Sequence, residues 1–312
     1  MRPFYAIGLK LTSVIIFMIM ASLIKVATTE VPAGQAVFFR SFFALPIVLG
    51  FLWHRGELHD GLKTQFPLGH LWRGLVGTAA MGTGFVSLSL LPFPEVNAIG
   101  YAAPILTVIF AALFLGERIR LFRMAAVALG LVGVLIVSIP NFTVSTASAS
   151  LALGAGFALV SATLRAIAIV TVRALVRSET TSSIVFYFSI ISALLGFLTL
   201  PLGLLLPDFA WVIPSGKVAG FMILAGLLGG IAQLLVTTSY RWAQMAVIAP
   251  FDYASMIFAV LFGYWFFSEL PSIYTWAGTP LVMAAGIVII YRERQLGLQR
   301  AKAAQTGKPS PY

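Results

Sequence analysis

The chain has 312 residues, of which 60% are hydrophobic and only 10% are charged, and its formal net charge is +10. A soluble globular protein is excluded, since such proteins usually have about a quarter of their residues charged. The absence of cysteine excludes disulfides, thiolate metal sites and cysteine catalysis. The basic residues are scattered over short connections and a tail rather than gathered on one face, so no nucleic-acid partner is expected.

Ten apolar segments follow one another along the chain, each close to the length of about 20 residues that crosses the hydrocarbon layer as a helix. Their approximate ranges are 8–27, 33–53, 70–91, 95–115, 121–139, 151–172, 183–206, 216–240, 245–267 and 274–291. The first segment is long for a signal peptide and lacks an A-x-A cleavage site, so we expect a retained span. Residues 292–312 form a polar, basic tail that we expect to be disordered or to lie on the membrane surface. The sequence therefore predicts an all-α integral membrane protein with ten transmembrane helices.

The distribution of basic residues predicts the orientation, because short cytoplasmic connections are enriched in Lys and Arg. A cytoplasmic N-terminus puts most of them inside: Arg2, Lys10, Arg55, Lys63, Arg73, Arg118, Arg120, Arg123, Arg173, Arg177, Arg241, Arg292, Arg294, Arg300, Lys302 and Lys308. Only Lys25 and Lys217 fall near the outer face. Both termini are therefore predicted to be cytoplasmic.

Two stretches of the chain resemble each other at an offset of 152 residues. "YAAPILTVIFAALFLGE" (Tyr101 to Glu117) aligns with "YASMIFAVLFGYWFFSE" (Tyr253 to Glu269), Tyr with Tyr and Glu with Glu. The chain is thus predicted to contain two halves of five spans, residues 1–140 and 148–291. Because five is odd, the second half must cross the membrane in the opposite sense. This explains why arginines follow Glu117 and none follows Glu269, and inverted repeats are a recurrent plan of secondary transporters.

Arg40, Arg165 and Asp252 are charged residues well inside the predicted spans, where a charge costs about 2.5–3.5 kcal/mol on insertion scales. Arg40 lies roughly 10 Å from the outer end of its span, and Arg165 and Asp252 lie roughly 10 Å from the inner ends of theirs. Matching depth and opposite sign predict an Arg165–Asp252 ion pair, and Arg40 is expected to reach Glu95. Such pairs either hold helices together or bind substrate or a coupling proton, and Asp252 is the candidate proton site.

Stripes of small and polar residues at helical spacing predict close helix packing. The stripes are Gly77, Ala80, Gly84 and Ser87; Gly154, Ala158, Ser161, Arg165 and Ala168; and Gly226, Gly230, Gln233, Thr237 and Tyr240. Gln233 stands out, because a buried amide can contact substrate as readily as a neighbouring helix. Tyr101 and Tyr253 lie near mid-span, where they can face a cavity and stack on an aromatic ligand.

Prolines interrupt three spans, at Pro46, Pro104 and Pro250, and each is expected to bend its helix, either as a static kink or at a moving gate. The three histidines, His54, His59 and His70, share one connection with irregular spacing. We interpret them as solvated loop residues rather than metal ligands.

The chain contains no G-x-x-x-x-G-K-[ST] motif and no catalytic constellation, so neither ATP drive nor an enzyme is predicted. No cofactor and no metal are expected.

With the repeat and "LGERIRLFRMAAVALGLVGVLIV" (residues 115–137) in view, the chain resembles the EamA branch of the drug/metabolite transporter superfamily. The matching features are Arg40, Pro104 with Glu117, a Gly-rich fifth span, and Glu269. This resemblance implies ten helices in two inverted EamA repeats, a central cavity and transport of small organic metabolites.

Within that family, residues 70–104 and 249–269 look like those of the bacterial riboflavin and S-adenosylmethionine carriers. The chain departs from the pattern at Ser268, where the family usually has Gly, and in "ELPS", which replaces a basic segment.

We therefore expect a multi-pass secondary carrier of the bacterial inner membrane, with riboflavin uptake as the first hypothesis. Export of amino acids or related metabolites and uptake of S-adenosylmethionine are the alternatives in the same class. A non-transporting membrane receptor or scaffold is the alternative outside it. The expected substrate-binding or coupling residues are Arg40, Tyr101, Arg165, Gln233, Asp252 and Tyr253. The expected partners are a small-molecule substrate and the lipid bilayer, and a homodimer is compatible with the sequence.

Overall fold

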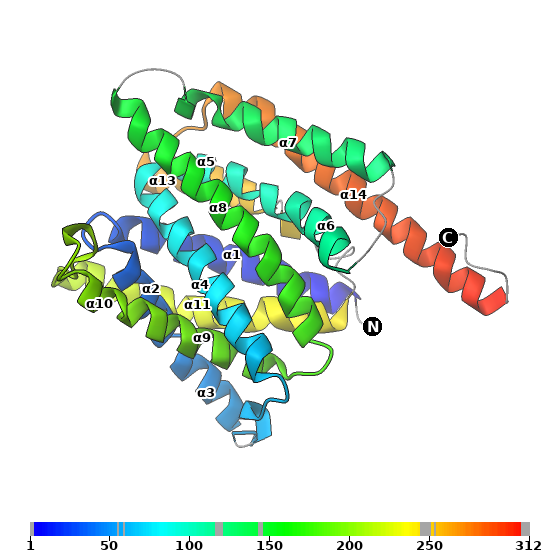
Figure 1. Ribbon diagram of the computed structural model, residues 1–312, viewed down its shortest axis with the longest axis horizontal. Helices are drawn as coiled ribbons and strands as arrows, with labels where there is room; N and C mark the ends of the chain where they lie inside the picture. Colours follow the sequence, from blue (N-terminus) through cyan, green and yellow to red (C-terminus); the bar gives the residue numbers. More distant parts are fainter. Residues whose placement is uncertain are drawn as a thin grey trace.

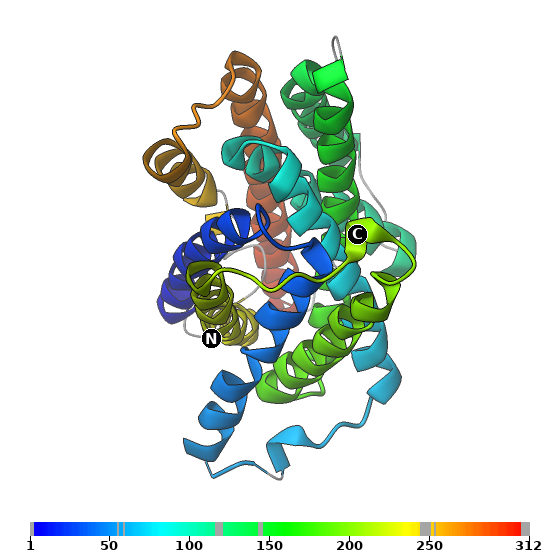
Figure 2. The ribbon, with the colours of Figure 1, turned by 90° about the vertical axis from the view of Figure 1, so that its left-hand side faces the viewer.

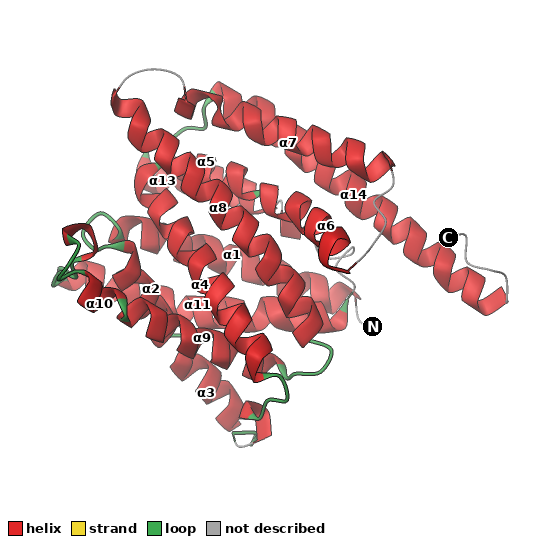
Figure 3. Cartoon of the chain, in the orientation of Figure 1, coloured by secondary structure: helices red, strands yellow, loops and turns green. Residues whose placement is uncertain are grey.

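The computed structural model describes residues 3–54, 56–58, 60–115, 121–142, 146–243, 251–252 and 254–306. Within these ranges every regular element is a helix (Figure 3). The helices of the first part of the chain are α1 (Pro3–Ala27), α2 (Ala33–Phe42), α3 (Leu45–His54), α4 (Pro67–Leu90), α5 (Phe93–Gly100), α6 (Ala102–Leu115) and α7 (Leu121–Phe142), with the short η1 (Asp60–Leu62). Those of the second part are α8 (Thr146–Leu175), α9 (Thr181–Phe197), α10 (Thr199–Leu202), α11 (Gly216–Trp242), α13 (Ala254–Phe267) and α14 (Ile273–Thr306), with the short η2 (Pro207–Phe209).

The helices follow the predicted apolar segments closely. Among the described residues, five segments are both long and apolar enough to cross a membrane: Phe4–Ala27, Ala33–His54, Ala149–Leu175, Thr181–Leu202 and Gly216–Trp242. The all-helical class is therefore confirmed. The number of spans and the side on which each terminus lies stay predictions.

Three of the apolar segments are broken in two, and each break lies four residues before a proline. Helix α2 ends at Phe42 before Pro46, α5 ends at Gly100 before Pro104, and α9 ends at Phe197 before Pro201. Proline has no N–H to bond the carbonyl four residues earlier, and its ring clashes with that carbonyl. Each proline instead occupies the first turn of the following helix, where the N–H is not needed. The interruptions at Pro46 and Pro104 agree with the sequence, and Pro250 lies outside the described residues.

The most extensive helix contacts join the first part of the chain to the second. They are α1 with α11, α4 with α8, and α7 with α14. Helix α1 lies beside α11 in both views of the ribbon, and α7 runs alongside α14 at the top of Figure 1 (Figure 1, Figure 2). Neither part of the chain therefore forms a bundle by itself.

Small residues let these helices approach closely, as the stripes predicted. The Ser161 hydroxyl on α8 donates a hydrogen bond to the Ala80 carbonyl on α4 over 2.7 Å, beside Gly84. Between α7 and α14, a Cβ added at Gly133 of α7 would lie 2.8 Å from the carbonyl oxygen of Gly278 of α14. Such contacts between backbones are possible only where side chains are absent or small.

The end of the chain differs from the prediction of a disordered tail. Helix α14 continues without a break to Thr306, and Figure 1 shows it extending past the other helices. Residues 292–306 are rich in Arg, Gln, Leu, Ala and Lys, which are strong helix formers, so an already formed helix is extended at little cost. Disorder is therefore wrong for residues 292–306, and residues 307–312 lie outside the described range.

Candidate functional site

A buried ion pair joins α1 to the segment that precedes α13. Lys10 Nζ lies 2.7 Å from Asp252 Oδ1, and Lys10 is only 3% exposed. The same ammonium lies 5.4 Å from the ring centroid of Tyr240, near the end of α11. A buried lysine needs such a counter-charge, because removing an unpaired ammonium from water is costly. The predicted partner of Asp252 was Arg165, and this prediction is wrong: the partner is Lys10.

Tyr101 occupies the break between α5 and α6, and its hydroxyl lies 2.9 Å from the Ser255 hydroxyl at the start of α13. Ser255 in turn donates a hydrogen bond to the backbone carbonyl of Asp252 over 2.6 Å. Pro104 causes the break, so it also places Tyr101 where it can reach the second half of the chain. Tyr101 and Asp252, both predicted from sequence, are thus brought into one site. Tyr253 lies outside the described residues.

Arg165 lies midway along α8 and faces the same region. A Cβ at Gly100, the last residue of α5, would be 3.6 Å from Arg165 Nη1. The Arg165 side chain is exposed on its helix rather than enclosed by neighbouring side chains. Since no described residue forms an ion pair with Arg165, this guanidinium is a candidate contact for a solute.

Arg40 and Arg73 form a second cluster, over the ring of Phe188 on α9. Their guanidinium carbons lie 5.5 Å and 4.0 Å from the ring centroid, and both side chains are buried. Arg40 was expected to reach Glu95 but lies over this ring instead. Arg73 was assigned to a cytoplasmic connection, yet it lies within the second turn of α4.

Gln233 lies on α11, one turn after Gly229, which contacts Arg40. Its amide makes a long hydrogen bond of 3.4 Å to the Thr237 hydroxyl on the same helix. The side chain is half-buried. The structure describes no stronger hydrogen bond from the Gln233 amide to a residue of the described ranges. Gln233 therefore stays a candidate substrate contact.

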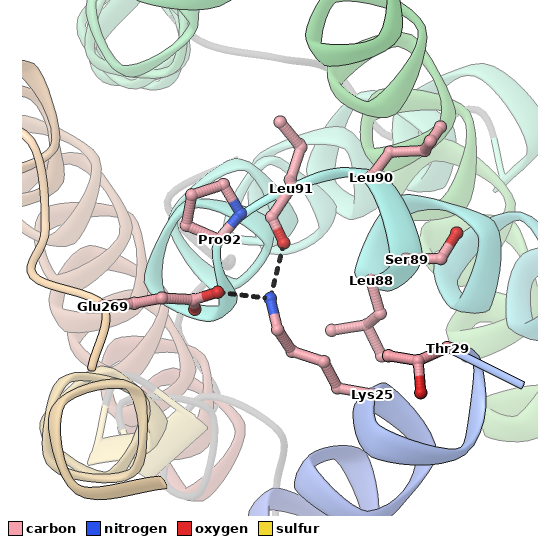
Figure 4. Close-up of a pocket in the computed structure, with 8 residues that line it drawn as sticks. All are labelled: Lys25, Thr29, Leu88, Ser89, Leu90, Leu91, Pro92 and Glu269. Atoms are coloured by element: carbon pink, nitrogen blue, oxygen red, sulfur yellow. Dashed lines mark hydrogen bonds and ion pairs between the residues drawn. The ribbon is translucent and has the colours of Figure 1, made fainter. Parts of the chain in front are cut away.

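A cleft of about 320 Å³ lies where the ends of α1, α4 and α13 meet (Figure 4). Lys25 on its floor pairs with Glu269 at 2.8 Å and donates a hydrogen bond to the Leu91 carbonyl, also over 2.8 Å. Glu269 accepts a further hydrogen bond of 2.7 Å from the Phe93 amide, at the start of α5. A carboxylate is favourable there because a helix N-terminus carries partial positive charge. The cleft is therefore closed at one side by a contact between α1, α5 and the segment after α13.

At the other end of the bundle, Glu179 in the connection between α8 and α9 organises a polar cluster. It accepts hydrogen bonds from the Gln65 amide (2.8 Å), the Thr64 hydroxyl (2.9 Å) and the Phe66 amide (3.1 Å). Burial tends to raise the pKa of Glu179. The hydrogen bonds from Gln65, Thr64 and Phe66 outweigh it and lower that pKa below its ordinary value.

His70 at the start of α4 belongs to this cluster. Its Nε2 lies 3.6 Å from Glu179 Oε2, its ring packs on Tyr187, and it is only 1% exposed. The prediction of three solvated loop histidines is therefore wrong for His70. His54 is exposed as expected, and His59 lies outside the described residues.

Sequence reasoning missed two of the buried charges, Lys10 and Arg73. Both were counted as cytoplasmic, although both fall inside the apolar ranges 8–27 and 70–91. The rule that an intramembrane charge indicates function applied to them as well. Phe188 had no signal in the sequence, because one phenylalanine among many apolar residues cannot be told from its neighbours.

Comparison with known proteins agrees with this architecture. The model of the EamA-like transporter family matches residues 4–139 and again residues 152–292. A riboflavin transporter of Rhizobium johnstonii is 28% identical, over 84% of this chain and 82% of its own length. An S-adenosylmethionine uptake transporter of Rickettsia felis is 25% identical over 87% of each chain. A pseudopaline exporter of Pseudomonas aeruginosa is 29% identical, over 88% of this chain and 91% of its own.

One solved crystal structure has the same fold, with a TM-score of 0.65 at 20% identity over 93% of this chain and 98% of that one. The apolar helices and the bacterial relatives make this a multi-pass protein of the bacterial inner membrane. Since the family model covers most of the chain in two matches, the chain belongs to the EamA-like transporter family of the drug/metabolite transporter superfamily.

Proposed function

We propose that this protein is a secondary transporter that moves a small organic metabolite across the inner membrane by alternating access of two inverted halves. One observation carries this proposal. Tyr101, at the break of one discontinuous helix, contacts Ser255 of the other half, next to the Lys10–Asp252 pair. In inverted-repeat transporters, substrate and coupling ions bind at the interface between the repeats, where helices are discontinuous.

The proposed halves are residues 1–140 and 148–291, with ten spans and both termini in the cytoplasm. Two matches of one family model support two repeats. The helix pairs support them as well, because α1 and α8 are the first helices of the two halves, and α4 and α11 are their counterparts further on. The pairs α1–α11 and α8–α4 are then the same contact made twice. A two-fold axis within the membrane plane would relate them.

Riboflavin uptake is the substrate hypothesis that we favour. It is supported by the riboflavin transporter of Rhizobium johnstonii, to which this chain is similar, and by the side chains around Tyr101 and Asp252. The flat ring system would stack on Tyr101 and Tyr253, and the ribityl hydroxyls would hydrogen-bond to Gln233 and Arg165. During the transport cycle Asp252 would take up and release a proton, or release Lys10 and pair with it again. Arg40 would contribute a positive charge further along the substrate path.

Growth of a riboflavin auxotroph that lacks its own carrier tests this hypothesis at limiting riboflavin. The wild-type chain should restore growth, and so should Glu57→Gln, which removes a carboxylate from an exposed connection. Asp252→Asn should not. Immunodetection in membranes verifies that each variant is inserted. No growth with a membrane-inserted wild-type chain would reject riboflavin uptake.

Export is the second candidate, because the pseudopaline exporter is as similar to this chain as the riboflavin transporter is. Amino acids or related metabolites would be the exported compounds, and S-adenosylmethionine uptake is a further alternative. Efflux from preloaded cells distinguishes export from uptake. A receptor or scaffold predicts no flux of any solute in proteoliposomes.

A further inference from the structure

Two cations lie deep in the bundle, and no described residue supplies a counter-charge to either of them. Arg40 on α2 is 3% exposed and Arg73 on α4 is 7% exposed, and both lie over the ring of Phe188. Arg40 is seven residues from the start of its helix and Arg73 is six residues from the start of α4. Arg40 and Arg73 therefore lie roughly 10 Å along the axis from the first residues of α2 and α4.

Neither guanidinium has its hydrogen-bonding needs met by the described part of the chain. The Nε and Nη1 atoms of Arg40, and the same two atoms of Arg73, are buried without a hydrogen-bond partner. In those same ranges neither side chain pairs with a carboxylate, and Asp252 is occupied by Lys10. Arginine stays protonated in proteins, so losing the proton cannot remove either charge.

The surrounding backbone is shaped to hold these groups in place. A Cβ at Gly77 of α4 would collide with Arg73 Nη1 and lie 2.7 Å from the Phe188 ring. At Gly229 of α11, a Cβ would lie 2.9 Å from Arg40 Nε. Two glycines on different helices therefore make room for the two guanidinium groups. The groups repel each other, and Tyr240 lies within electrostatic range of Arg73.

We propose that Arg40 and Arg73 bind an anionic group, a carboxylate or a phosphate, beside the ring of Phe188. Two fixed cations with unpaired N–H donors in a low-dielectric interior are a strong site for such oxyanions, and the planar guanidinium matches their geometry. The oxyanion belongs either to the transported metabolite or to a free ion from solution. In the first case the assignment rests on the proposed transport function, and the substrate is then an anionic metabolite rather than neutral riboflavin.

Thermal unfolding of the purified full-length protein in detergent tests the site without transport. Sodium phosphate and sodium acetate serve as minimal probes, with sodium chloride at equal ionic strength as the reference. Riboflavin and riboflavin 5′-phosphate are the larger probes, since they differ only in the anionic group. We expect a saturable rise of several degrees in the unfolding midpoint with at least one anionic probe.

The variants Arg40→Gln and Arg73→Gln should each abolish that rise, whereas Lys217→Gln should keep it. Lys217 is an exposed lysine over Phe221, so this control removes the same charge outside the cluster. Without anion, Arg40→Gln or Arg73→Gln should raise the midpoint, because one of two repelling charges is gone. A merely structural arginine would instead lower it. If either glutamine variant fails to fold, Arg→Lys at that position should weaken binding about tenfold, by losing the planar fork.

A rise of the unfolding midpoint with phosphate or acetate means that the site binds a free anion from solution. A rise with riboflavin 5′-phosphate alone, at a Kd at least tenfold below that of riboflavin, assigns an anionic group carried by a larger solute. A midpoint that no anionic probe raises, or that rises equally in the glutamine variants, overturns the proposal. Either result leaves the uptake experiment unaffected, so the two proposals fail separately.

Discussion

Lys25 and Glu269 form an ion pair of 2.8 Å that joins the end of α1 to the segment following α13. Because Glu269 also accepts the Phe93 amide and Lys25 also donates to the Leu91 carbonyl, the pair connects three elements from both parts of the chain. In an alternating-access cycle this contact would have to break whenever that end of the protein opens.

Glu269→Gln should therefore lower the free energy of unfolding by about 1–3 kcal/mol, the usual range for a lost hydrogen bond to a charged group. The reversed pair, Lys25→Glu with Glu269→Lys, should restore only part of the loss, since a lysine cannot accept the Phe93 amide. Chemical denaturation in detergent measures both effects. Full recovery in the reversed pair would show that the α5 contact contributes nothing.

Removing one partner of the Lys10–Asp252 pair should be more harmful than removing both. Asp252→Asn leaves a buried ammonium without a counter-charge, which costs about 3–5 kcal/mol in comparable sites. The double variant Lys10→Gln with Asp252→Asn should recover most of this stability. Thermal unfolding of the single and double variants, compared in a double-mutant cycle, gives the coupling. Additive losses would argue against a direct pair.

The same substitution tests the role of Asp252 in coupling. If this carboxylate takes up a proton during transport, Asp252→Asn should abolish uphill accumulation while exchange across the membrane continues. Flux into proteoliposomes with and without a pH gradient measures both. Undiminished accumulation in the variant would mean that Asp252 is structural only.

Ser268→Gly should stabilise the protein. Ser268 directly follows α13 and has φ = 54°, in the left-handed region, where an L-residue with a side chain is disfavoured by about 1–2 kcal/mol. Glycine avoids this penalty but loses more chain entropy on folding, so a net gain of about 0.5–1 kcal/mol is expected.

Ser272→Ala is the matched control and should act in the opposite direction. Ser272 accepts the Thr275 amide at the start of α14, and losing such a cap costs about 1 kcal/mol. Relative to the wild-type protein, the denaturant midpoint should therefore rise for Ser268→Gly and fall for Ser272→Ala.

Glu179 should make stability depend on pH at the acid end. Its pKa is lowered in the folded state, so its contribution is complete above the ordinary glutamate pKa of about 4.3 and is lost as pH falls through the lowered folded value. Glu179→Gln should cost about 1–3 kcal/mol near neutral pH. The difference from wild type should shrink in acid, as followed by thermal midpoints over a pH series. A difference that is constant with pH would exclude the charged carboxylate as its cause.

Pro104→Ala should impair transport without unfolding the protein. Alanine restores the N–H that can bond the Gly100 carbonyl, so α5 and α6 would tend to merge and displace Tyr101. Pro280→Ala is the control, because Pro280 lies inside the unbroken α14. Uptake rates per inserted molecule should fall at least tenfold for the first variant and little for the second.

Composition was sufficient for the all-helical membrane class, because a membrane helix must satisfy its own backbone hydrogen bonds and so appears in the sequence as a long apolar run. Prolines located the breaks before Pro46 and Pro104, whereas the break before Pro201 was not predicted. The family's usual glycine at position 268 is explained by the left-handed backbone found there, which sequence alone could not show.

Pairing of charges was harder to predict. Depth along a helix can be counted, but it could not choose between Arg165 and Lys10 as the partner of Asp252. That choice depends on which face of α1 and α8 turns inward, a consequence of packing between distant segments. The Arg40–Arg73 cluster has the same origin, since only the approach of α9 brings one ring beside both side chains.

Helix α14 has 34 residues, or about 51 Å at 1.5 Å per residue, whereas the hydrocarbon layer is about 30 Å thick. About 20 Å of this helix therefore extends beyond the hydrocarbon layer when its axis lies along the membrane normal. A fluorescent protein joined through a short linker near Thr306 would be held away from the bundle, which makes this terminus the natural attachment point for distance measurements between the two halves.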